Sequence, residues 1–129
     1  MPVDKGSLIQ YRLQRANETI KESEDDISKN YLHSAENRIY YAIFYSVMAL
    51  ALKHDFATSK HKNLMGWFNK NFIKTGIIEK EYGDIYREAL ENRIEGDYED
   101  LKTFSIGEVN LDYSNMIKFV KRIEELIIK

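Results

Sequence analysis

Two arginines lie where the surrounding residues predict a buried helix face. Arg38 stands directly before an apolar run over residues 39–52, and Arg93 lies on a stripe of tyrosine and aliphatic residues at helical spacing. Because an unpaired buried charge is costly, each guanidinium needs a partner or access to solvent. A guanidinium offers a rigid fork of donors that suits a phosphate or a partner's carboxylate. Asp97 follows Arg93 by four residues, so an ion pair within the helix is an equally good explanation.

The histidines give no sign of a metal site, whereas two tyrosines allow either a core role or a binding role. His33, His54 and His61 have no metal-site spacing and the chain has no cysteine, so we expect no metal and no cofactor. Tyr40 and Tyr41 lie just after the first of the two arginines. Aromatic residues at helical spacing usually form core, but the neighbouring charge also allows a polar pocket lined by these rings. A core role and a binding role both stay open.

The composition is that of one globular domain in residues 1–129. Hydrophobic residues make up 43% and charged residues 31%, and the net charge of −2 gives the whole molecule no footprint for nucleic acid. Residues 53–74 are locally basic, with five lysines and one aspartate. The run over 39–52 is too short to span a bilayer, and no signal peptide precedes it, so we expect a cytoplasmic protein.

The period of the apolar residues predicts five helices. The seams run through residues 9–27, 39–52, 64–72, 82–90 and 109–127, and no segment alternates as a strand does. A polar break is expected over residues 25–30, and Thr58 or Ser59 is a candidate N-cap for the third helix. We therefore expect an all-α fold, an antiparallel four-helix up-and-down bundle with an additional short helix.

Three sequence elements, in this order and spacing, resemble those of a known family. They are AENRIYYAIFY at residues 35–45, TSKH at 58–61 with FIKTG at 72–76, and NRIEGDY at 92–98. The arrangement resembles the HEPN family, the small all-helical "higher eukaryotes and prokaryotes nucleotide-binding" domains, in its stand-alone bacterial and archaeal branch. The resemblance extends from about residue 7 to residue 127.

The resemblance implies a partner and a chemistry. Relatives often form homodimers and are commonly encoded beside a minimal nucleotidyltransferase, in toxin–antitoxin or defence modules. Many are metal-independent ribonucleases with an Arg-x(4–6)-His motif on a late helix. Here Arg93 matches the arginine, but Tyr98 stands five residues on and no histidine follows. A tyrosine with a pKa of about 10 is a poor base at neutral pH.

The residues together with the resemblance suggest three functions. The first is a module that binds a nucleotide, RNA or a nucleotidyltransferase, with six candidate ligand-binding residues: Arg38, Tyr41, His61, Arg93, Asp97 and Tyr98. The second is a divergent metal-independent endoribonuclease, in which Arg93 and Tyr98 would be the catalytic pair, or His61 would replace the missing histidine. The third is a structural protein in which the arginines are merely paired.

Overall fold

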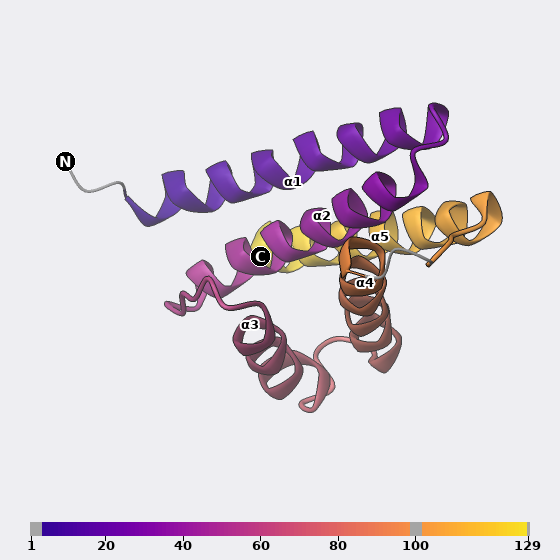
Figure 1. The fold of residues 1–129 in the computed structure, drawn as a ribbon. Coiled ribbons are helices and arrows are strands. Elements are labelled where there is room, and N and C mark those ends of the chain that lie inside the picture. Colours follow the sequence, from indigo (N-terminus) through magenta and orange to yellow (C-terminus); the bar gives the residue numbers. More distant parts are fainter. Residues whose placement is uncertain (1–3, 99–101, 129) are drawn as a thin grey trace.

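The computed structural model describes residues 4–98 and 102–128, which form helices and their connections with no strand. The helices are α1 (Lys5–Ser28), α2 (Leu32–Lys53), α3 (His61–Phe68), the π-helical turn η1 (Asn69–Ile73), α4 (Lys80–Tyr98) and α5 (Ile106–Ile128). The expected all-α fold with four long helices and one short one is confirmed (Figure 1). No helix in this part of the chain is long and apolar enough to cross a membrane.

Helix α2 is the centre of the fold. Its apolar run buries residues on most of the helix surface, as the sequence predicts, and it packs against α1, α3, α4 and α5. In Figure 1, α1 returns antiparallel to α2, α5 lies behind α2, and α4 crosses below them at a steep angle. The Lys53 ammonium at the end of α2 donates to the carbonyls of Leu126 and Ile127, both at 2.8 Å. Helices α2 and α5 therefore run in the same direction.

One strip of α2 stays partly exposed, and this strip positions the candidate site. Tyr41, Tyr45, Met48 and Leu52 are half-buried, whereas their neighbours on the rest of the helix are mostly buried. The spacing of four, three and four residues places them on one helix face. The strip lies between α1 on one side and the start of α3 on the other.

Helix ends differ from expectation at two places. The break after the first helix begins later than expected, because Asp25 and Asp26 lie inside α1 and the left-handed residue is Asn30, with φ of 60°. The N-cap of α3 is Lys60 rather than Thr58 or Ser59, and it has no side-chain cap. Thr58 instead accepts a hydrogen bond from the Lys60 amide, at 3.2 Å.

Candidate functional site

Helices α2 and α4 bring the two arginines to the same tyrosine ring. The guanidinium carbon of Arg38 lies 5.3 Å from the centre of the Tyr41 ring, and that of Arg93 lies 5.4 Å from it. Arg93 also lies 5.8 Å from the centre of the Tyr40 ring. These distances allow cation–π attraction, which holds both cations at one point of the surface. Two guanidinium groups that are far apart in sequence thus form one cluster.

The predicted ion pair of Arg93 is present, but it uses little of the guanidinium. Arg93 Nε lies 3.2 Å from Asp97 Oδ2, yet this buried N–H does not point along a hydrogen-bond direction and has no hydrogen-bond partner. Asp97 accepts a bond from Asn37 Nδ2, at 3.2 Å. The contact is therefore electrostatic attraction without a bidentate fork, and the donors of Arg93 stay available.

Arg38 reaches partial solvent exposure, as its position before the apolar run requires. Its side chain is 28% exposed, and Glu22 of α1 lies 3.5 Å from Nη1. Nε and Nη2 both donate to the Oδ1 atom of the neighbouring Asn37, the first at 3.1 Å. Asn37 accepts from Nε and Nη2, and Glu22 pairs with Nη1 as an ion without a hydrogen bond, so the guanidinium keeps N–H donors that no described residue accepts.

His61 joins the cluster from the first turn of α3. Its ring stacks on Phe44 with 4.4 Å between centres, and its Nδ1 lies 2.6 Å from the hydroxyl of Tyr40. Burial, with a contribution from the charge of Arg93, lowers the pKa of His61 below its ordinary value of 6.5. The imidazole is therefore largely neutral at pH 7.

The Tyr40 hydroxyl decides which nitrogen of His61 carries the proton. Tyr40 is fully buried, and among the described residues His61 is the hydrogen-bond partner of its hydroxyl. Burial raises the pKa of Tyr40 well above its ordinary value, so the hydroxyl keeps its proton. A buried O–H without an acceptor is costly, so the hydroxyl donates to Nδ1. Nε2 of the neutral ring is then a hydrogen-bond donor.

The structure thus brings together five of the six residues that the sequence singled out. Arg38, Tyr41, His61, Arg93 and Asp97 lie around the crossing of α2 and α4. The side chain of Tyr98 lies outside the described residues. A further arginine, Arg15 of α1, lies beside the exposed strip of α2. Its guanidinium carbon is 5.3 Å from the centre of the Tyr45 ring. Arg15 was not predicted, because nothing in the sequence links it to Tyr45, which belongs to the next helix.

A buried polar group next to the cluster was also missed. Glu36 of α2 is 1% exposed, and both its carboxyl oxygens lie buried without a donor, facing Asp112 of α5. Burial and the contact with Asp112 raise the pKa of Glu36 to about 9. Glu36 therefore holds a proton at neutral pH and donates it to Asp112, which also accepts from Asn92 at 3.2 Å. A glutamate on the buried face of the central helix was the available signal.

Comparison with known proteins gives the family. The HEPN domain model matches residues 9–129. A UPF0332 protein of Thermotoga maritima is 39% identical over 124 residues, covering 96% of this chain and 94% of that protein. Two proteins of Methanocaldococcus jannaschii, each named "putative toxin", are 32% and 31% identical over 67% and 70% of this chain, and over 59% and 67% of their own lengths. The chain belongs to the HEPN family.

Proposed function

We propose that this chain is an RNA-binding HEPN domain with a toxin-type role, and that its arginine–tyrosine cluster binds the phosphodiester groups of single-stranded RNA. The main support for this proposal is that two guanidinium groups lie over one tyrosine ring and that each keeps N–H donors without an acceptor in the described part of the protein. Phosphate oxygens accept from paired guanidinium donors, and the partly exposed rings of Tyr41 and Tyr45 beside them can stack on unpaired bases. The names of the two M. jannaschii relatives agree with a toxin-type role.

The state of His61 supports binding rather than cutting. A ribonuclease that uses no metal needs a group to remove the proton of the attacking hydroxyl. His61 cannot do this while its Nδ1 accepts the Tyr40 proton and its Nε2 already carries one. It can donate a hydrogen bond to a phosphate oxygen, which adds to the donors of Arg38 and Arg93. We therefore place His61 in the binding surface.

Salt dependence measures how many phosphates the cluster contacts. For single strands, log K falls with log salt at a slope of roughly −0.7 for each neutralised phosphate. Fluorescence anisotropy with a labelled 12-nucleotide oligouridine should therefore give a slope of about −1.4 if Arg38 and Arg93 each contact one phosphate. The Arg93→Ala variant should lose roughly 10- to 150-fold in affinity and about 0.7 in slope, because a charge-assisted hydrogen bond contributes about 1.5–3 kcal/mol.

Arg87→Ala is the matched control, because Arg87 is also on α4 and its side chain is 50% exposed among carboxylates. It should bind oligouridine as the wild type does. Unchanged affinity and slope in Arg93→Ala would refute the proposal. The same samples, incubated with RNA in the presence of a chelator, test the ribonuclease alternative. Cleavage that disappears in Arg93→Ala would establish cutting in place of binding.

The assembly is a further part of the proposal. We propose a homodimer that works with a nucleotidyltransferase, as the family resemblance implies. Half of the exposed large apolar side chains in the described residues lie on α5: Ile106, Leu111, Ile117 and Ile128. Light scattering on the purified chain should give twice the mass of 15.2 kDa. A monomer at micromolar concentration would contradict the dimer without affecting the RNA experiment.

A further inference from the structure

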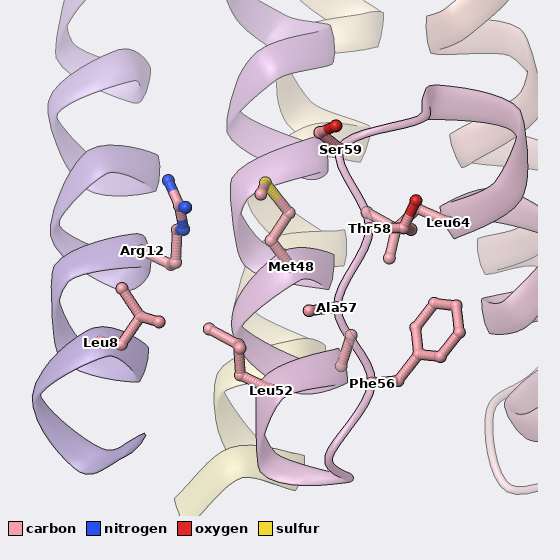
Figure 2. Close-up of a pocket in the computed structure, with 10 residues that line it drawn as sticks. Leu8, Arg12, Met48, Leu52, Phe56, Ala57, Thr58, Ser59 and Leu64 are labelled. Carbon is pink, nitrogen blue, oxygen red and sulfur yellow. The ribbon is translucent and has the colours of Figure 1, made fainter. Parts of the chain in front are cut away.

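A cavity of about 280 Å³ lies at the far end of the exposed strip of α2. Figure 2 shows Leu8 and Arg12 of α1 facing Met48 and Leu52 of α2, with the 56–59 segment running along the other side of α2. Phe56 and Leu64, whose side chains lie beyond this segment in the view, also line the cavity. The wall is therefore mainly apolar, and Thr58 and Ser59 add hydroxyl groups.

Arg12 is the charged member of the cavity wall. Its Nε atom is buried and has no hydrogen-bond partner, and its guanidinium carbon lies 5.6 Å from the centre of the Tyr11 ring. Among the described residues Arg12 has no carboxylate within ion-pair distance, unlike Arg15, whose Nη1 lies 2.7 Å from Glu18. A buried donor without an acceptor is destabilising. The terminal nitrogens of Arg12 have no hydrogen-bond partner among the described residues either, so they can donate to an occupant with acceptor atoms.

The cavity and the arginine–tyrosine cluster lie on one continuous strip. Met48, which lines the cavity, follows Tyr41 by seven residues on the same face of α2, or roughly 10 Å along the helix. Between them lies Tyr45, with Arg15 stacked over its ring. Cations thus accompany the strip at Arg38, Arg15 and Arg12. A groove that combines cations and aromatic rings at this spacing suits a single strand of nucleic acid.

We infer that this cavity receives a guanine base from the same RNA strand whose phosphates bind at the arginine–tyrosine cluster. The inference rests on the proposed function. The volume lies just below the range of about 300–1,000 Å³ typical of sites for drug-sized ligands, so it suits one planar heterocycle. An arginine fork pairs with the O6 and N7 acceptors of guanine, whereas uracil lacks this paired edge. Apolar walls cover the faces of the base.

Trp67 gives this inference a direct signal. It is the single tryptophan of the chain, and its ring stacks on Phe56 of the cavity wall with 5.3 Å between centres and 4° between planes. Guanosine monophosphate should change the Trp67 fluorescence at a concentration at least roughly tenfold lower than uridine monophosphate does. Arg12→Gln should raise the guanosine monophosphate concentration needed by about tenfold. Ala57→Leu, which enlarges a side chain at the cavity wall, should also weaken the response, and Arg87→Gln should not.

A second experiment measures the binding of RNA strands, using labelled oligouridine with and without one central guanine. The guanine should tighten binding to wild-type protein by about tenfold, and Arg12→Gln should abolish this gain while binding uridine-only RNA almost as well. Equal responses to the two monophosphates, or a guanine gain that persists in both Arg12→Gln and Ala57→Leu, would overturn the inference. The Arg93→Ala variant should keep the Trp67 response to guanosine monophosphate. If the Arg93→Ala variant bound oligouridine as tightly as the wild type, the proposed function would be refuted. The evidence for guanine binding in the cavity would not be affected.

Discussion

Replacing the buried glutamate by its neutral isostere should make the protein more stable at neutral pH. The ordinary pKa of Glu36 is 4.5 and burial raises it to about 9. Folding at pH 7 therefore requires this carboxyl to take up a proton that the unfolded chain does not hold. The uptake spans about 2.5 pH units, and because one pH unit corresponds to about 1.4 kcal/mol, it costs roughly 3 kcal/mol. Glu36→Gln removes this cost.

The amide of the variant can take over the contact. One N–H of the introduced amide would donate to Asp112 as the protonated carboxyl does, and the second N–H would stay buried without a partner at a cost of about 1 kcal/mol. The net gain in the free energy of unfolding at pH 7 is then about 2 kcal/mol, or on the order of 8 °C in Tm for a domain of this size. Asp112 shares the proton, because burial also raises its pKa.

The pH dependence separates this explanation from a simple packing effect. A group with a raised folded-state pKa contributes stability that is complete below about pH 4.5 and is lost as the pH rises towards 9. Urea denaturation at pH 5.5, 7 and 8 should therefore show the advantage of Glu36→Gln growing with pH, by about 1.4 kcal/mol per unit. His61 titrates alike in both proteins, so its contribution cancels in the difference.

Glu91→Gln on the exposed face of α4 is the control, since the Glu91 side chain is 59% exposed. It should change stability by less than about 0.5 kcal/mol at every pH. A Glu36→Gln variant that is less stable than the wild type at pH 8, or an advantage that stays constant from pH 5.5 to 8, would refute the reasoning. Either result would mean that Glu36 is not protonated in the folded protein.

Two further predictions compare matched positions by thermal denaturation. Tyr86→Phe should stabilise the protein by about 1 kcal/mol, since the fully buried Tyr86 hydroxyl has no partner among the described residues. Tyr40→Phe should destabilise it by about as much, since the Tyr40 hydroxyl is hydrogen-bonded to His61. Equal effects of the two substitutions would contradict the hydrogen-bond assignment. Gly66→Ala inside α3 should stabilise by about 0.5–1 kcal/mol, because nothing in the described structure lies within 4 Å of the added carbon. Gly76→Ala should destabilise by about 1 kcal/mol or more, because φ there is +77°; two stabilised variants would refute the backbone argument.

The sequence predicts well what depends on short spacing. The apolar run of α2, the helical seams and the i,i+4 contact of Arg93 with Asp97 are all local patterns, and each is present. The contacts that give the site its chemistry are not local. Tyr40 meets His61 across 21 residues, and Glu36 of α2 meets Asp112 of α5. No periodicity encodes such pairs, because they depend on how α3 and α5 dock on α2.

The contact between Tyr40 and His61 decides how far the family resemblance extends to activity. The missing histidine after Arg93 does not by itself exclude cleavage, because the fold supplies another histidine beside the same two tyrosine rings. What opposes cleavage is the hydrogen bond, which leaves His61 with a donor at Nε2 and no free lone pair. Asp97 is already occupied by Arg93 and Asn37, and Glu22 forms an ion pair with Arg38, at 3.5 Å from Nη1. A cluster of donors without a free proton acceptor can bind a phosphodiester strongly and still leave its bond intact.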